Sequence, residues 1–329
     1  MSASGVVLHF TGPPESEVDD LGFENPWQLG RGKELNEKAE EARNEFLAFW
    51  KSYLPILIRR RKRWDQMDPR RNTSLLQRFI LKGIPSCMRR EIWLRNCPPR
   101  PSGRSVVPQH VLDAIQLDLP RTFPDNVHIR SPEARRQLGR VLVCLAEQIP
   151  SIGYCQGLNF IAGLCLLVLN DETRAADLLV HLVSPRAEYY TDDMNGLRRD
   201  IQVLDEIIRL ELPAVHCTLR AVEIGLDILV GKWFLCLFID SLPMESVLRI
   251  WDCLIYEGDA WLFRVTLRLL RGNEKKLSAC RRMDELISVV HSIGETRNAM
   301  QCHALIKAAK HERITAKQID QLRLRFAAP

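Results

Sequence analysis

The residues with the clearest chemical potential are an acid and a base at the end of a predicted helix. Asp118 precedes Arg121 by three residues, and Pro120 and Pro124 lie on either side of the arginine. This spacing places the carboxylate one helical turn behind the guanidinium, close enough to hold it in a fixed pose. The two prolines would stiffen the loop that presents it, because each fixes its own φ angle.

A second polar group interrupts apolar surroundings at residues 153–159, where small residues form a turn before a buried helix. Gln156 is expected to project from this turn beside the helix N-terminus. An arginine and a glutamine are the pair that GTP hydrolysis requires, since one neutralises charge on the transferring phosphoryl group and the other orients the attacking water. From the residues alone, Arg121 could equally form a structural ion pair and Gln156 an ordinary cap. No rule of sequence brings the two together in space.

Other chemistries are excluded by spacing. A P-loop has four residues between its glycines and Ser or Thr after the lysine, but Gly225 and Gly231 are separated by five residues and Trp233 follows Lys232. The metalloprotease, esterase and kinase signatures are also missing. Cys155 has no neighbouring histidine in sequence to hold a thiolate. The sequence therefore predicts no hydrolase active site of its own.

Composition is that of an ordinary globular protein. The 329 residues include 46 Lys and Arg against 41 Asp and Glu, a net charge of +5, and 46% are hydrophobic. This weak charge gives no reason to expect a nucleic-acid partner. The ten cysteines form no C-x-x-C pair and mostly lie in apolar runs, which predicts buried, reduced thiols and no metal site. A cytoplasmic location fits this cysteine usage and the lack of a recognisable targeting segment.

The N-terminal 30 residues differ from the remainder. They contain five acids and no Lys or Arg. Such a segment cannot bury much, so residues 1–30 are predicted to be a disordered acidic head. The most apolar stretches, 152–169 and 224–242, both contain polar side chains and are predicted to be buried core helices rather than membrane spans.

Helical periodicity dominates the chain, which predicts an all-α fold. Ser131 and Pro132 form a clear helix start, and Gly83–Pro85 a clear break. The run Arg59–Arg63 is interpreted either as the solvated face of a helix or as a patch facing phosphoinositides or a GTPase. Helices are expected over 35–57 (with a kink at Pro55), 75–81, 111–119, 132–150, 158–169, 175–182, 200–210, 215–229, 232–241, 244–257, 261–270 and 315–325.

Three blocks of sequence resemble the TBC domain of Rab GTPase-activating proteins. They are Lys82-Gly83-Ile84-Pro85 with Arg89 and Trp93, Ile115-x-x-Asp118-x-x-Arg121-Thr122-Phe123-Pro124, and Gly153-Tyr154-Cys155-Gln156-Gly157-Leu158-Asn159. Further signatures follow in order: Met194-x-Gly196-Leu197, Leu212-Pro213, Trp233-Phe234, Leu242-Pro243 and Arg249-Ile250-Trp251-Asp252. The resemblance implies a multi-helix TBC domain at 82–272, with a helical N-terminal extension at 31–81 and a C-terminal helical segment at 273–329.

The resemblance also implies roles. Arg121 matches an arginine finger and Gln156 a glutamine finger, both supplied in trans, while Asp118, Thr122, Tyr154 and Asn159 would support them. The partner would be a GTP-loaded Rab that binds GTP and Mg²⁺ itself, so no cofactor is expected here. Through the Rab, the protein would reach endomembranes transiently.

Two departures and two alternatives accompany this resemblance. Pro120 directly precedes the finger, and the connection 95–111 is short and Pro-rich, so a helix found in relatives is expected to be missing. One alternative is a Rab-binding adaptor without catalytic effect, although intact Arg121 and Gln156 argue against it. The other is an interaction protein that dimerises through the heptads of residues 35–57.

Overall fold

The computed structural model describes residues 9–26, 37–68, 73–95, 97–101 and 105–327 of the chain. These divide into two compact units, with the boundary between Asp192 and Asp193. The boundary falls inside the stretch 82–272 that the sequence predicts to be one domain. The predicted limits at residues 30, 81 and 272 stay predictions.

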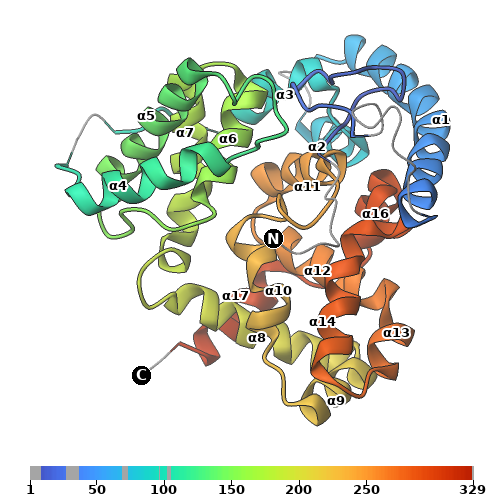
Figure 1. Cartoon of the computed structure of the whole chain (residues 1–329). Coiled ribbons are helices and arrows are strands. Elements are labelled where there is room, and N and C mark those ends of the chain that lie inside the picture. Colours follow the sequence, from blue (N-terminus) through green and yellow to red (C-terminus); the bar gives the residue numbers. More distant parts are fainter. Residues whose placement is uncertain (1–8, 27–36, 69–72, 96, 102–104, 328–329) are drawn as a thin grey trace. The chain divides into compact units, whose positions relative to one another are not determined.

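The N-terminal unit confirms the all-α prediction, since helices account for its regular structure apart from isolated β-bridges among the described residues. Its centre is α6, which is buried along most of its length and packs against α5, α7 and α3. Figure 1 shows α5, α6 and α7 lying together in green. The elements are α1 (Glu37–Asp65), α2 (Thr73–Lys82), α3 (Ser86–Leu94), α4 (Gln109–Asp118), the 3₁₀ turn η1 (Leu119–Arg121), α5 (Pro132–Gln148), α6 (Leu158–Leu169), α7 (Glu172–Val183) and η2 (Ser184–Tyr189).

Local signals in the sequence set several of these boundaries. The Ser131 hydroxyl accepts a hydrogen bond of 3.1 Å from the Ala134 amide, and Pro132 is the first residue of α5. Helix α4 ends at Asp118, and Pro120 lies in the 3₁₀ turn that follows. A proline lacks the amide hydrogen that would continue an α-helix, so the tighter turn replaces it. The helix expected over 111–119 therefore ends one residue early, at Asp118.

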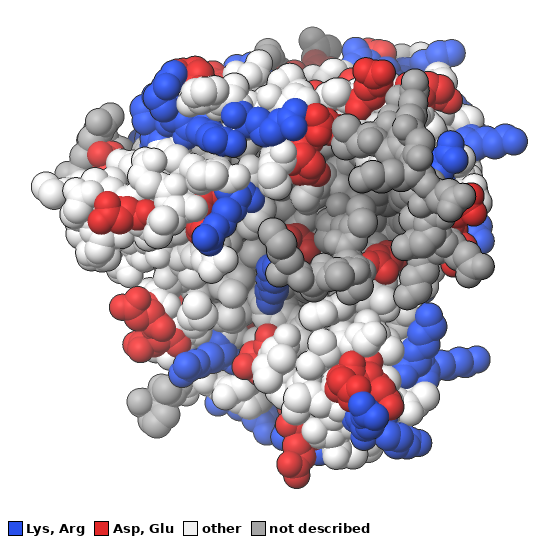
Figure 2. Space-filling model, viewed as in Figure 1, with Lys and Arg blue, Asp and Glu red and all other residues white. Residues whose placement is uncertain are grey.

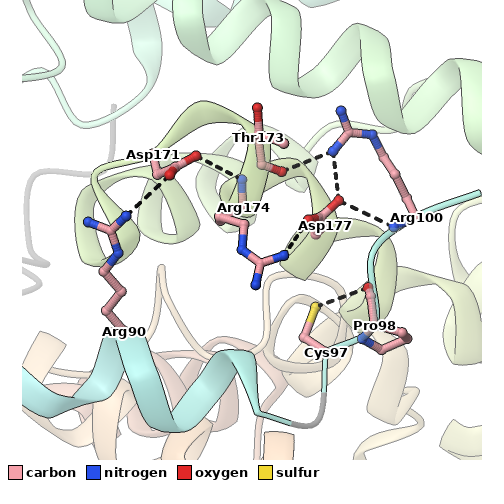
Figure 3. A network of polar contacts seen from close by, with 8 residues as sticks. All are labelled: Arg90, Cys97, Pro98, Arg100, Asp171, Thr173, Arg174 and Asp177. Atoms are coloured by element: carbon pink, nitrogen blue, oxygen red, sulfur yellow. Dashed lines mark hydrogen bonds and ion pairs between the residues drawn. The ribbon is translucent and has the colours of Figure 1, made fainter. Parts of the chain in front are cut away.

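The connection between α3 and α4 contains no helix in its described residues, as predicted. It is tied to α7 by Asp177, a carboxylate that is 4% exposed (Figure 3). The Arg100 guanidinium and backbone amide bind one oxygen of Asp177 at 2.7 and 3.3 Å, and Arg174 binds the other at 3.2 Å. Two cations thus compensate one buried anion. Burial and the nearby Asp177 charge raise the pKa of Cys97 to about 11, which keeps this thiol protonated.

The prediction of a disordered head is wrong for residues 9–26. Phe23 is fully buried and packs edge-on against Phe123, with ring centroids 5.2 Å apart. The backbone of Phe23 also pairs with Asn126. Asp19 faces inward and accepts 2.9 Å hydrogen bonds from the amides of Leu21 and Phe23. The acid therefore closes a turn instead of facing solvent. Residues 1–8 and 27–30 of the predicted head lie outside the described residues.

Helix α1 includes Pro55 and continues to Asp65, through the basic run. Four of the five basic side chains in this run are exposed, but Arg60 is buried. Its guanidinium donates to the Tyr53 hydroxyl at 3.1 Å. Trp64 donates to the carbonyl of Gly83 at 2.8 Å. A Cβ at Gly83, which has φ +117°, would lie 2.3 Å from the Arg60 guanidinium, so the glycine makes room for this contact.

The C-terminal unit contains helices α8 to α17, and two predictions fail there. The helix expected over 215–229 is two helices, because Glu223 adopts a left-handed conformation between them. The helix expected over 232–241 ends at Leu235. The elements are α8 (Asn195–Glu211), α9 (Pro213–Val222), α10 (Leu226–Leu235), α11 (Met244–Glu257), α12 (Ala260–Gly272), α13 (Glu274–Ala279), α14 (Met283–Ser292), η3 (Ile293–Glu295), α15 (Arg297–Met300), α16 (Cys302–Ala309) and α17 (Ala316–Arg325).

The early end of α10 has a tertiary cause. Leu237 and Phe238 take positive φ angles of 47° and 68°, which non-glycine residues rarely adopt, and both are fully buried. Trp251 of α11 donates to the Leu237 carbonyl at 3.1 Å. Burial of two large side chains offsets the local strain, and this is invisible to helical periodicity.

Helix α17, which covers the helix expected over 315–325, has one docked face. Ile319 is 1% exposed, and Arg323 binds both oxygens of the fully buried Asp200 at 2.8 and 2.6 Å. Thr315 and Gln318 form the capping box that begins the helix. Across the described ranges, no helix is both long enough and apolar enough to span a bilayer.

Candidate functional site

Arg121 ends the 3₁₀ turn that follows α4, and its side chain is 72% exposed. Its guanidinium lies 3.7 Å from a carboxylate oxygen of Asp118, whose side chain is only 11% exposed. This distance exceeds that of a hydrogen bond, although the charges still attract each other. The carboxylate therefore biases the direction of the guanidinium while leaving its N–H groups available to another molecule.

Gln156 lies in the loop that leads into α6, and it is exposed. The backbone on either side takes positive φ angles, 58° at Gly153 and 109° at Gly157. Only glycine adopts such angles without strain, so these two residues set the path of the loop. The Gly157 amide donates to the Asn159 side chain at 3.1 Å, which fastens the loop to the first turn of α6.

The two turns are joined by hydrogen bonds between residues 36 and 37 positions apart. Tyr154 donates from its hydroxyl to Asp118 at 2.7 Å. Asn159 donates from its amide group to the Thr122 hydroxyl at 2.8 Å, and this hydroxyl donates to the Asp118 carbonyl at 2.9 Å. The structure thus gathers all six residues singled out in the sequence: four form the network, and Arg121 and Gln156 project from its two turns.

Burial makes this network rigid. Asp118, Thr122 and Asn159 are 8%, 2% and 1% exposed. A buried polar group that is left unpaired destabilises the folded state, so these hydrogen bonds strongly favour one arrangement. The rigid part is the support, and the exposed part is the arginine and the carboxamide.

The sequence analysis did not predict that the ring of Phe123, two residues after Arg121, is buried. Phe123 has a φ of 44° and is fully buried against Phe23 and Phe160, with ring centroids 5.2 and 5.4 Å away. A Cβ at Gly163 of α6 would lie 2.9 Å from the Phe123 ring. Two features of the sequence could have indicated this packing: the aromatic Phe123 shortly after the arginine, and Gly163 inside an apolar helix.

A pocket of about 380 Å³ lies beside the arginine turn, and the sequence analysis did not predict it. Arg135 contributes a buried Nε atom that has no hydrogen-bond partner within the described residues. Arg136 is paired with Glu133, and Arg140 with Glu172 at 2.7 Å. The pocket is lined by Gln116, Leu119, Pro120, Arg135, Arg136, Gly139, Arg140 and Val143. Two of its three arginines are therefore already paired with carboxylates.

The thiol of Cys155, next to Gln156, is not activated as a nucleophile. Burial and the charge of Asp192 raise the pKa of Cys155, so this thiol stays protonated near neutral pH. All ten cysteines are free, and six of them are buried, including Cys165. No group of three or more potential metal ligands occurs in the part of the chain that the structure describes. The arrangement can offer an arginine and a carboxamide to a nucleotide bound by another molecule.

Comparison with known proteins defines the class. The Rab-GTPase-TBC domain family matches residues 103–278, and this chain belongs to that family. The match spans the turns of Arg121 and Gln156 and the buried Arg249–Asp252 motif of the C-terminal unit.

Individual relatives agree with this assignment and with the resemblance in the sequence motifs. The chain is 52% identical over 311 residues to growth hormone-regulated TBC protein 6 of Caenorhabditis elegans, covering 94% of this chain and 92% of that protein. It is 34% identical to human growth hormone-regulated TBC protein 1, covering 88% of each chain. The crystal structure of the Chlamydomonas flagellar RabGAP TBC domain is similar in fold, with a TM-score of 0.68 and 28% identity over 89% of this chain and 99% of that one.

Proposed function

We propose that this chain is a GTPase-activating protein for a Rab-family small GTPase. Arg121 enters the nucleotide site of the Rab and neutralises negative charge that develops on the phosphate oxygens during hydrolysis. Gln156 orients the attacking water. Both groups act in trans, so the chain has no hydrolase site of its own and accelerates a reaction that takes place on its partner.

One observation carries this proposal: Arg121 and Gln156 are exposed on two turns that a buried hydrogen-bond network holds together. Asp118, Thr122, Tyr154 and Asn159 are positioning residues, since each touches the turns rather than the substrate. A preorganised support matters because a misplaced charge loses most of its effect on the transition state.

The proposal includes the nature of the partner and the setting. The Rab is GTP-loaded and carries both GTP and Mg²⁺, so this chain requires no cofactor. The protein is cytoplasmic and reaches endomembranes transiently, where it meets the GTP-loaded Rab.

A screen of GTP hydrolysis across purified Rabs tests the proposal. At least one Rab is expected to hydrolyse GTP much faster with the wild-type chain than with the Arg121→Ala variant. Arg95→Ala is the matched control, since Arg95 is an exposed arginine outside the site. If a Rab binds tightly but no Rab is accelerated, the chain is a Rab-binding adaptor and the catalytic proposal is wrong.

A further inference from the structure

The outward face of α1 carries apolar side chains that nothing in the described structure covers. Leu47, Leu54 and Ile58 are 36%, 47% and 51% exposed. Their spacing of seven and four residues places them in one row along the helix. The opposite face is already occupied by the core of the unit, with Phe46, Phe49, Trp50, Tyr53 and Trp64 all buried.

Basic side chains flank this row from Lys51 onward, while the exposed acids Glu40, Glu41 and Glu45 lie in the turns around and before Leu47. From Phe46 through Trp64 the sequence contains no Asp or Glu. Lys51 and Lys62 lie one turn after Leu47 and Ile58, and both lysines are exposed. Exposed bases in this stretch are Lys51, Arg59, Arg61, Lys62 and Arg63. The nearest acid toward the C-terminus is Asp65, which pairs with Arg61 at 2.9 Å.

Further bases lie at the end of α2. The Trp64 and Phe79 rings pack 5.4 Å apart, which holds the end of α1 against α2. Burial and the positive charges of Arg78 and Arg63 lower the pKa of Lys82, so these three bases lie near one another. Figure 2 shows basic side chains protruding at the upper right edge of the view, where Figure 1 places α1, with acidic side chains beside them.

We propose that this face of α1 binds the surface of an anionic lipid bilayer. The row of Leu47, Leu54 and Ile58 enters the headgroup region, and the flanking bases contact lipid phosphates. An apolar row bordered by Lys and Arg is the pattern of helices that lie in the membrane interface. A second copy of the chain fits less well, because pairing two such faces would bring like charges together.

This inference does not depend on the proposed GTPase activation, and its test needs no GTPase. The full chain is sedimented with vesicles of phosphatidylcholine alone or of phosphatidylcholine with about 30 mol% phosphatidylserine, which gives them an anionic surface. Binding is expected with the anionic vesicles and should fall as salt rises, because screening weakens contacts to the surface charge. Each base near the surface contributes about fivefold to partitioning. The Lys51→Glu/Lys62→Glu variant should therefore lose about 25-fold or more.

The apolar contribution is tested separately. Leu54→Ser/Ile58→Ser should lower vesicle binding about tenfold, since two side chains lose their transfer into the interface. The matched controls are Lys275→Glu/Lys276→Glu and Leu210→Ser/Ile228→Ser, which make the same changes at exposed positions of the C-terminal unit. They should bind like wild type.

Three results would overturn the inference. The first is equal binding to neutral and anionic vesicles, and the second is equal loss in the variants and their controls. The third is a concentration-dependent dimer in analytical ultracentrifugation that Leu54→Ser/Ile58→Ser abolishes, which would assign the face to a second copy. Thermal melting of each variant establishes that it is folded, as expected for exposed positions.

Discussion

Two of the pairs of arginine and aspartate that lie three residues apart in this protein have opposite properties. In the N-terminal unit, Arg121 is 72% exposed and lies 3.7 Å from Asp118. In the C-terminal unit, Arg249 and Asp252 are both fully buried and form an ion pair of 2.6 Å. The first pair leaves the guanidinium free to act on another molecule, whereas the second satisfies a charge that the core has enclosed.

The difference lies in the neighbouring residues. Arg249 lies in α11, and its neighbours Val247, Ile250 and Trp251 are all fully buried. Arg121 follows Pro120 in a short turn, where the helix has already ended. Spacing alone therefore predicts that the two charged groups lie close together. The packing around them decides whether the arginine is exposed to another molecule.

The largest expected effect concerns the exposed arginine. Arg121→Ala should lower the stimulated hydrolysis rate of the cognate Rab by about 10³–10⁵, or about 4–7 kcal/mol of barrier, with little change in Rab affinity. Its melting temperature should equal that of wild type, since the side chain is exposed. Arg121→Lys should not restore the rate, because an ammonium lacks the planar fork of a guanidinium. Single-turnover hydrolysis measures the rate. If the Arg121→Ala variant stimulated the Rab as strongly as the wild-type chain does, Arg121 would have no part in the mechanism.

The buried arginine should show the reverse behaviour. Arg249→Ala deprives Asp252 of its ion-pair partner in the core and should cost about 3–5 kcal/mol of unfolding free energy. Chemical denaturation followed by circular dichroism measures this loss. Arg220→Ala is the control, because Arg220 forms an exposed pair with Asp205 at 3.0 Å whose loss should cost under about 1 kcal/mol. Equal stability of the two variants would contradict the comparison.

A smaller effect is expected at the second turn. Gln156→Ala should lower the stimulated rate by about 10²-fold, because a positioned polar group is lost while the arginine still neutralises charge. Stability should be unchanged, since Gln156 is exposed. The same single-turnover assay applies, and an unaltered rate would show that water is oriented by another group.

The smallest effect should come from the support between the turns. Tyr154→Phe removes the hydroxyl that donates to Asp118 at 2.7 Å, at a cost of about 1.5–3 kcal/mol for a hydrogen bond to a charged group. The maximal hydrolysis rate should fall about tenfold while half-saturation by the Rab stays constant, because Arg121 is held less firmly. A purely structural role would also lower stability but would leave the maximal rate of the folded protein intact.

Sequence reasoning recovered much of the N-terminal unit because its signals are local. Ser131 and Pro132 begin α5, and Gly83 follows the last residue of α2, as the residues predict. The errors arose where distant contacts override local preference. Phe23 belongs to a stretch of acidic composition, yet it is buried against Phe123, about a hundred residues away. Leu237 and Phe238 continue a helical pattern but turn out of the helix, because burial of both side chains outweighs strained φ angles.

The sequence by itself determined the helical class and the motifs of the TBC family, and it named the six residues proposed for the site, because residue types, periodicity and spacing are written in it. Only the tertiary structure decided that the turns of Arg121 and Gln156 lie side by side, that Arg249 is enclosed and that the row of Leu54 and Ile58 is left uncovered. The physical reason is that burial and hydrogen bonding between distant segments depend on how helices pack. No window of neighbouring residues contains that information.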